Sequence, residues 1–263
     1  MQTNDGPVLY SSAGGIAEIR FNRPDRLNVL DLEMAQAFAA AVERVTADET
    51  LRVVVISSEG RAFVAGGDLA HFRTSQDTRA AAAELIDPLH GALKMLAAAP
   101  VISLGSVKGA VAGAGMSLAL NFDLLVAADD ATFNLAYARI GAPPDCGGSW
   151  ALPRLVGVRR ALEIALLSDT VGADEALRLG LANRIVPRDQ LEAETARLAA
   201  RLAAGAPMAQ ARIKELMRTS LGNAYAEQLD AEAQAFGDCA VTDDFSEAVE
   251  AFFARRKPVF KGV

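Results

Sequence analysis

The chain has 263 residues, of which 51% are hydrophobic and 22% charged, and a formal net charge of −7. This length allows one large domain or two small ones, and the composition is typical of a globular protein with a sizeable core. The acidic balance and the lack of a membrane-length apolar segment or a signal-peptide pattern predict a soluble cytoplasmic protein without nucleic-acid or membrane partners.

The first half of the sequence alternates predicted strands with predicted helices. Strands are indicated by alternating apolar residues or short β-branched runs, and helices by apolar residues at helical spacing. The predicted strands are 15–21, 52–57, 101–106 and 124–127, and the predicted helices are 32–45, with Asp31 as N-cap, and 79–98. Strands alternating with helices imply crossover connections on a largely parallel sheet, so we expect an α/β fold.

Helical patterns dominate the second half, from about Asp145 to the end, interrupted by a strand-like piece at 183–186. We therefore expect two regions, an α/β core over 1–200 and a C-terminal helical region over 201–263. A basic cluster, Arg255 to Lys257, lies near the end of the last predicted helix. On its own, this cluster is typical of a solvated helix end where cations oppose the helix dipole.

Two glycine-rich segments, 61–68 and 113–118, each follow a predicted strand. Consecutive small residues let a ligand approach the main chain closely and leave N–H groups free to point at it. The second segment opens a very apolar helix, whose N-terminal N–H groups favour negative charge. Neither matches a P-loop or a Rossmann fingerprint, and each alone is equally typical of an ordinary turn. Asp68 is a candidate cap for the helix after the first segment.

A third segment, IGAPPDCGGSW, spans residues 140–150 and carries Asp145 between Pro-Pro and an apolar helix. Taken alone, this position favours Asp145 as a helix N-cap. The three segments occur in an order that resembles the enoyl-CoA hydratase/isomerase (crotonase) superfamily along essentially the whole chain. The resemblance is carried by FNRPDRLNVLD, RAFVAGGDL, GAVAGAGMSLAL, IGAPPDCGGSWALPRLVG and AFFARRKPVFKG. The third segment looks most similar to the epoxyphenylacetyl-CoA isomerase and enoyl-CoA isomerase members.

The resemblance implies a crotonase (ClpP-like) fold, a spiral of ββα repeats followed by a helical trimerisation region. It also implies assembly as a homotrimer or as a hexamer that is a dimer of trimers. The substrate would be an acyl-CoA, with CoA entering as part of the substrate. We expect no permanently bound cofactor and no metal.

The resemblance further implies that the main-chain N–H groups of Gly67 and Ala114 form an oxyanion hole for the thioester carbonyl. Donors fixed in a water-poor site stabilise the enolate-like charge as it develops. Ala114 stands where glycine is more usual, which is harmless if its φ is negative. The residues implied for CoA binding are Arg26, Val29, Ala65, Gly66 and Asp68, with Phe236, Phe252 and Arg255 from the C-terminal helices, sometimes of a neighbouring subunit; Val64 is a candidate pocket residue.

Departures from the family pattern bear on the reaction. Ser117 and Tyr137 stand where a crotonase-type hydratase has its two glutamates, and neither is a carboxylate base at neutral pH. Asp145 aligns with the proton-handling aspartate of related isomerases, and one carboxylate can remove a proton and return it to another carbon. We therefore expect an enoyl-CoA isomerase. Ser117 is expected to bond to a main-chain carbonyl, and Tyr137 to form a pocket wall or a hydroxyl partner for Asp145.

Three alternatives stay open. One is an enoyl-CoA hydratase with weak activity. Another is an aryl-CoA dehalogenase or hydrolase that uses Asp145 as nucleophile and His90 as base, although a lone histidine on a helix is more often a surface or satisfied core residue. RNA binding is disfavoured because the chain is acidic and has no helix rich in Lys and Arg.

Overall fold

β-branched and apolar residues build the centre of the molecule, which a computed structural model describes over residues 6–262. Six strands form one sheet in the order β1-β2-β3-β4-β6-β9, and three short strands form a second sheet in the order β5-β7-β8. The strands are β1 (Val8–Ala13), β2 (Ile16–Phe21), β3 (Val53–Ser58), β4 (Ile102–Val107), β5 (Ala110–Ala112), β6 (Leu124–Ala128), β7 (Thr132–Asn134), β8 (Val171–Gly172) and β9 (Arg184–Val186).

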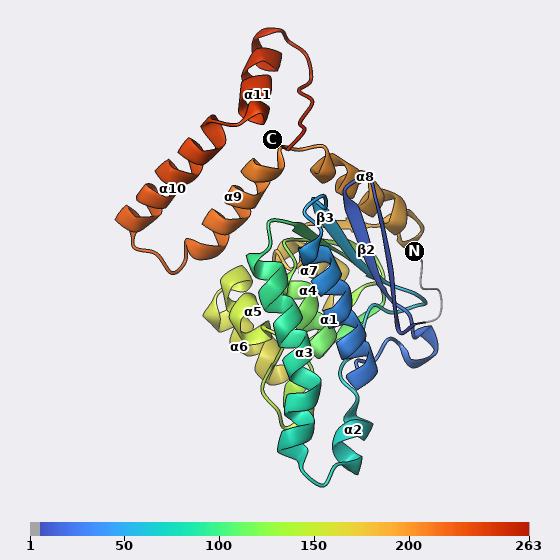
Figure 1. Ribbon diagram of the computed structural model, residues 1–263. Coiled ribbons are helices and arrows are strands. Elements are labelled where there is room, and N and C mark those ends of the chain that lie inside the picture. Colours follow the sequence, from blue (N-terminus) through green and yellow to red (C-terminus); the bar gives the residue numbers. More distant parts are fainter. Residues whose placement is uncertain (1–5, 263) are drawn as a thin grey trace.

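Helices connect the strands and cover the larger sheet (Figure 1). They are α1 (Leu32–Ala47), α2 (Leu69–Thr74), α3 (Thr78–Ala98), α4 (Ala114–Asn121), α5 (Gly148–Val156), α6 (Val158–Leu167), α7 (Ala173–Arg178), α8 (Leu191–Ala203), α9 (Pro207–Thr219), α10 (Tyr225–Ala240) and α11 (Asp243–Phe253). The pairs β2–β3, β3–β4, β4–β6 and β6–β9 are parallel, and only β1–β2 is antiparallel within this sheet. The predicted parallel α/β core is confirmed.

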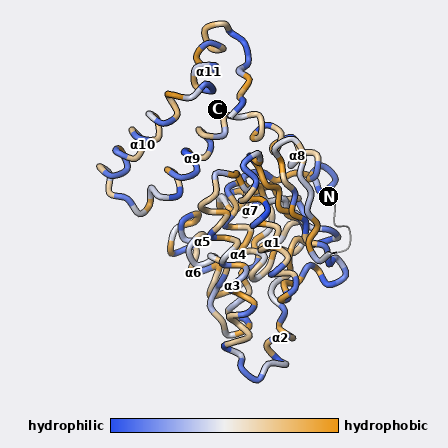
Figure 2. Tube along the Cα trace, viewed as in Figure 1, coloured by the Kyte–Doolittle hydropathy of each residue, from blue (hydrophilic) through white to orange (hydrophobic). Residues whose placement is uncertain are grey.

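Both faces of the sheet are buried, each by its own hydrophobic core. Consecutive residues of a strand point to opposite sides, so each core receives alternate side chains. In β3, Val54 and Ile56 belong to the larger core with α1 and α3, whereas Val53 and Val55 pack with α8 on the other face. Figure 2 shows the hydrophobic residues concentrated along these central strands. The double burial explains why this strand reads as a continuous apolar run.

Helices α9, α10 and α11 project away from the body that holds the sheet (Figure 1). The boundary predicted at residue 200 falls within α8, which packs on the sheet, and the projecting part begins only at α9. The division into regions 1–200 and 201–263 stays a prediction. Over residues 6–262, no helix is long and apolar enough to cross a membrane.

A buried lysine anchors α9 to the body. The Lys214 ammonium lies 2.7 Å from the Leu96 carbonyl oxygen, 2.8 Å from that of Val101 and 3.1 Å from the Asp123 carboxylate. Arg218 holds the other carboxylate oxygen of Asp123 at 2.6 Å. Only 7% of Lys214 is exposed, and its pKa is lowered because burial outweighs the attraction of Asp123.

We expect Lys214→Met to lower the free energy of unfolding by about 3 kcal/mol, the lower end of the cost of breaking a buried ion pair, because Arg218 still holds Asp123. Chemical denaturation measures this change. Lys94→Met, at an exposed position of α3, is the matched control and should change stability by less than about 0.5 kcal/mol. Equal effects of the two substitutions would contradict the anchoring role.

Candidate active site

The first glycine-rich segment runs beside the loop that precedes α1. The Ala65 and Asp68 N–H groups donate to the carbonyls of Leu27 and Leu30, at 3.1 and 2.9 Å. Within residues 6–262, the N–H of Gly67 has no protein acceptor. Gly66 has a φ of +125°, a conformation that favours glycine, and so lets the chain turn here. The segment thus presents a free main-chain donor at Gly67.

The second glycine-rich segment brings the start of α4 against the first. Gly113 has a φ of +52°, and a β-carbon on it would lie 3.4 Å from the Cα of Gly66. A β-carbon on Gly115 would collide with the Val64 carbonyl oxygen, so glycine is required for this close approach. Ala114 is the first residue of α4, and no protein acceptor reaches its N–H in the described chain.

Ala114 has a negative φ, so alanine is accommodated where the resemblance suggests glycine. The left-handed turn falls on Gly113 instead. As the first residue of a helix, Ala114 has an N–H without an intrahelical partner, and the helix dipole adds to its attraction for negative charge. The two free donors, at Gly67 and Ala114, therefore lie on adjoining segments.

Asp145 lies in a chain of hydroxyl groups that begins on α4. The Tyr137 hydroxyl donates a hydrogen bond to Oδ1 of Asp145, and the Ser117 hydroxyl lies 3.2 Å from the Tyr137 oxygen. Ser117 comes three residues after Ala114, so the hydroxyl chain starts within the first turn of the helix that carries the free donor. Ser117 contacts Tyr137, and the expected hydrogen bond to a main-chain carbonyl is wrong.

Electrostatics keep the neighbours of Asp145 neutral. Burial, and secondly the Asp145 carboxylate, raise the pKa of the Tyr137 phenol well above its ordinary value. Burial and then the same carboxylate also raise the pKa of the Cys146 thiol. In the described chain, no Lys, Arg or His nitrogen forms an ion pair with Asp145, which is half-buried. The site therefore contains one carboxylate without a cation, held by a phenol that stays protonated.

Asp145 does not cap α5. The N-cap residue is Gly147, which has no side chain to cap with, and the Asp145 main-chain carbonyl accepts the N–H of Gly148 at 2.9 Å. The N-cap interpretation is therefore wrong. The Asp145 side chain instead accepts the Tyr137 hydroxyl, and the two residues that follow it, Cys146 and Gly147, have left-handed φ values of +46° and +73°.

The turn after Asp145 is held from two helices. His90 of α3 accepts the Cys146 N–H on Nε2 at 3.1 Å. Asn121, the last residue of α4, donates to the carbonyls of Ser117 at 2.8 Å and Cys146 at 3.0 Å. His90 is thus half-buried and hydrogen-bonded to the turn that follows Asp145. Asn121 was not predicted from the sequence, because its role depends on a hydrogen bond to Cys146, which lies 25 residues further along the chain.

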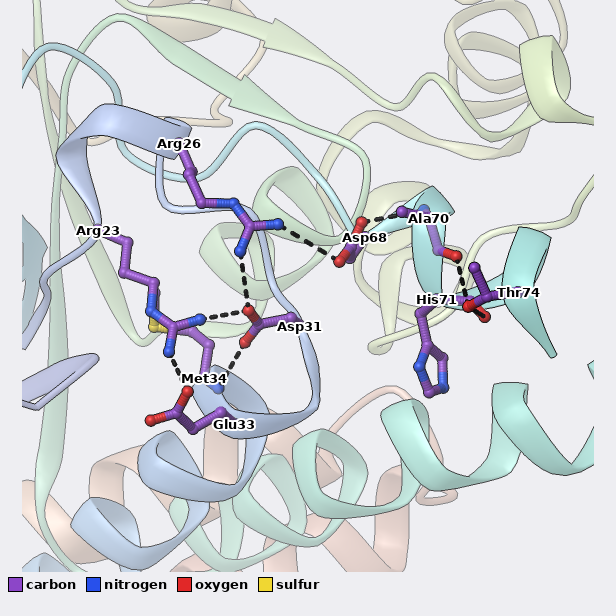
Figure 3. Close-up of polar contacts among 9 residues, drawn as sticks. All are labelled: Arg23, Arg26, Asp31, Glu33, Met34, Asp68, Ala70, His71 and Thr74. Carbon is purple, nitrogen blue, oxygen red and sulfur yellow. Dashed lines mark hydrogen bonds and ion pairs between the residues drawn. The ribbon is translucent and has the colours of Figure 1, made fainter.

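Of the residues implied for CoA binding, Arg26 and Asp68 lie together at the first glycine-rich segment (Figure 3). The Arg26 guanidinium lies 3.5 Å from both Asp31 and Asp68. Asp31 caps α1 by accepting from the Met34 N–H at 2.9 Å, and Asp68 caps α2 by accepting from the Ala70 N–H at 3.0 Å. Both predicted caps are confirmed, and they hold the Arg26 side chain across the segment.

Val29, Ala65 and Gly66 adjoin this arrangement, since the Leu30 N–H donates to the Gly66 carbonyl at 2.9 Å. Val64 is fully buried, and its carbonyl accepts the Ala112 N–H at 2.9 Å. It therefore joins the two glycine-rich segments as part of the core. Over residues 6–262, no group of three or more His, Cys, Asp or Glu side chains is placed to hold a metal ion.

The C-terminal candidates lie elsewhere in the single chain. Phe236 on α10 and Phe252 on α11 are 66% and 77% exposed, and Arg255 follows α11. These helices project away from the body that carries Gly67 and Asp145 (Figure 1). One copy of the chain therefore does not bring these three residues to its own site.

Known proteins are similar to this chain over nearly its whole length. The sequence profile of the enoyl-CoA hydratase/isomerase family matches residues 11–263. A probable enoyl-CoA hydratase of Rhodobacter capsulatus is 37% identical over 256 residues, which cover 97% of this chain and 98% of that protein. The 1,2-epoxyphenylacetyl-CoA isomerase of Escherichia coli is 33% identical over 260 residues, with coverage of 97% and 98%.

A solved structure agrees with the sequence comparisons. The crystal structure of an enoyl-CoA hydratase from Polaromonas superposes with a TM-score of 0.90 at 32% identity, covering 97% of this chain and 100% of that one. Relatives of similar identity are thus named both as hydratases and as isomerases. The fold is the crotonase fold, and the chain belongs to the enoyl-CoA hydratase/isomerase superfamily.

Proposed function

We propose that this enzyme is an enoyl-CoA isomerase that moves a double bond, or opens a ring epoxide, next to a CoA thioester. The observation that carries the proposal is the Asp145 carboxylate, which accepts the hydroxyl of Tyr137. Tyr137 and Ser117 stand at the two positions where the family resemblance places the glutamates of a hydratase. CoA enters as part of the substrate, and no resident cofactor takes part. The name of the Escherichia coli relative supports the same class of reaction.

In the proposed reaction, the Asp145 carboxylate takes a proton from C2 of a 3-enoyl thioester. The C–H electrons move into the conjugated system, and the thioester oxygen gains negative charge as a dienolate. The N–H groups of Gly67 and Ala114 stabilise this charge. The carboxylic acid then returns the proton to C4, which leaves a 2-enoyl thioester and restores the carboxylate.

Hydration is disfavoured by the residues beside Asp145. Adding water across a double bond requires one group to activate the water while another delivers a proton to the α-carbon. The Tyr137 phenol has a raised pKa and stays protonated, and the hydroxyl of Ser117 is used by Tyr137. One carboxylate suffices for a proton that leaves and returns.

A substrate panel tests the proposal: 3-enoyl-CoA, 2-enoyl-CoA, 3,5-dienoyl-CoA and an aryl-CoA, each with the purified protein. We expect double-bond migration to be the fastest reaction and hydration of 2-enoyl-CoA to be slow. Rapid formation of 3-hydroxyacyl-CoA, with no migration of the double bond, would contradict the isomerase assignment.

A second candidate is aryl-CoA dehalogenation, favoured by the position of His90 beside the Asp145 turn. In that reaction Asp145 attacks the ring carbon, halide leaves, and a base activates water to cleave the aspartyl ester. The geometry weakens this candidate because the Nε2 lone pair of His90 already accepts the Cys146 N–H. Release of chloride from a chlorinated aryl-CoA would revive it.

Tyr137→Phe is expected to lower kcat for double-bond migration about tenfold, which corresponds to a hydrogen bond to a charged group worth about 1.5 kcal/mol. The phenol holds Oδ1 of Asp145, and its loss frees the carboxylate to rotate. Steady-state kinetics measure the change, with Tyr10→Phe on β1 as the matched control. Equal kcat values for the two variants would remove Tyr137 from the mechanism.

We further propose that the chain works as a homotrimer or as a dimer of trimers. The projecting helices and the turn between α9 and α10 carry large apolar side chains that are more than half exposed in one copy: Ile213, Met217, Leu221, Tyr225, Phe236, Phe252 and Phe253. Burying such side chains stabilises assembly, and a neighbouring copy would supply Phe236, Phe252 and Arg255 to the site. Sedimentation analysis that found only monomers would contradict this assembly.

A further inference from the structure

The backbone at Cys146 has a conformation that costs free energy. Cys146 has a φ of +46° and is fully buried, although a non-glycine residue rarely adopts a left-handed φ. Such a conformation persists only where the surroundings hold it, and it is often found at functional sites. Cys146 directly follows Asp145, so the turn that has this conformation also carries the backbone of Asp145, whose carboxylate accepts the Tyr137 hydroxyl.

Two side chains hold this turn, one on each side of the Cys146 peptide groups. His90 accepts the Cys146 N–H at 3.1 Å, and Asn121 donates to the Cys146 carbonyl at 3.0 Å. A β-carbon on Gly147 would lie 2.7 Å from the Asn121 amide nitrogen, so glycine makes room for this contact. The turn is therefore held by hydrogen bonds from α3 and α4, in addition to its own chain geometry.

The hydrogen bond from the Cys146 N–H to His90 determines which ring nitrogen of His90 carries the proton. A main-chain N–H can only donate, so Nε2 must carry a lone pair and the proton of the neutral ring must lie on Nδ1. An imidazole whose Nε2 lone pair is already used cannot activate water with the same atom. No ion pair joins His90 to the Asp145 carboxylate among residues 6–262, so its contact is with the backbone of the turn.

We propose that His90 is a positioning residue, whose neutral Nδ1–H ring holds the Cys146 N–H and so keeps Asp145 aligned with Tyr137. Asn121 supports the same turn from its other side. This inference rests on the proposed role of Asp145 as the proton carrier. It predicts that an uncharged acceptor can replace the imidazole, whereas a side chain without an acceptor cannot.

The chain offers an internal spectroscopic control, because it contains only two histidines. His71 of α2 has its Nε2 3.2 Å from the Ala81 carbonyl oxygen, which can only accept. His71 therefore requires a proton on Nε2, the opposite arrangement to His90. Long-range proton–nitrogen correlation spectra of the intact protein should show one ring of each type, and a His71→Gln variant should remove the Nε2–H ring. Finding His90 with a proton on Nε2 would overturn the proposal whatever the enzyme's activity.

Kinetics test the consequence for Asp145. In His90→Gln, the side-chain amide oxygen can take the place of Nε2 as acceptor, whereas His90→Leu has a similar size and no acceptor. We expect His90→Leu to lower kcat about 10²-fold, the effect of a small misplacement, with less change in KM, and His90→Gln to restore most of that loss. His71→Gln is the control and should keep the activity of the unmodified protein.

Two kinetic outcomes would overturn the positioning role. If His90→Gln lost as much activity as His90→Leu, the imidazole would be acting as an acid or base. If neither substitution changed kcat, the turn would not depend on His90. Failure of the isomerase proposal itself looks different, since the unmodified protein would then not move the double bond, and the spectra would still report the state of His90.

Discussion

Asp145→Asn is expected to lower kcat for double-bond migration by about 10²- to 10⁴-fold, the usual contribution of a positioned acid–base group. Asparagine has nearly the same shape and its side-chain oxygen can still accept the Tyr137 hydroxyl. An amide cannot take up the substrate proton, however, so only the chemical step is removed. We therefore expect KM to change much less than kcat.

Exchange of the substrate's C2 protons with deuterated water separates this role from a structural one. The unmodified protein should catalyse the exchange, and Asp145→Asn should not, while its melting temperature stays near that of the unmodified protein. Asp189→Asn, at an exposed position, is the matched control and should keep full activity. Rapid exchange by Asp145→Asn, or rapid hydration of a 2-enoyl-CoA by that variant, would show that another group carries the proton.

The parts of the fold that sequence reasoning predicted are those where burial creates a strong pattern. β3 is buried almost throughout and begins with the apolar run Val53–Ile56, and β4 is buried throughout with apolar residues at alternate positions, Ile102 and Leu104. α1 was predicted together with its cap, because Asp31 precedes a clear helical repeat. The missed strands include β5, β7 and β8, which have two or three residues each and are too short to show an alternation.

The site was predictable where glycine spacing reports backbone geometry, and less so where side chains meet across the fold. The close approach of the two glycine-rich segments is visible in the sequence as Gly115, since a larger residue there would collide with Val64. The Ser117–Tyr137 and His90–Cys146 contacts cannot be predicted from local sequence patterns, because they join residues 20 and 56 positions apart. Local preference for Asp before a helix even favoured the wrong role, that of an N-cap.

Ala114→Pro is expected to lower kcat/KM by at least about 10²- to 10³-fold, the cost of removing one oxyanion donor. The substitution deletes the Ala114 N–H, and the proline ring also enters the space where the thioester oxygen would lie. Kinetics with a 3-enoyl-CoA measure the loss. Ala114→Gly keeps the N–H and is the matched control, with activity near that of the unmodified protein.

The structure accommodates proline at this position, so the loss should not come from misfolding. Ala114 is the first residue of α4, where proline is favoured because the N–H has no helical partner. A residue before proline must avoid helical backbone angles, and Gly113, with φ +52° and ψ −124°, already does so in a region open to glycine. We therefore expect Ala114→Pro to fold with nearly unchanged stability. A variant that kept both its stability and its activity would show that the Ala114 N–H does not hold the thioester oxygen.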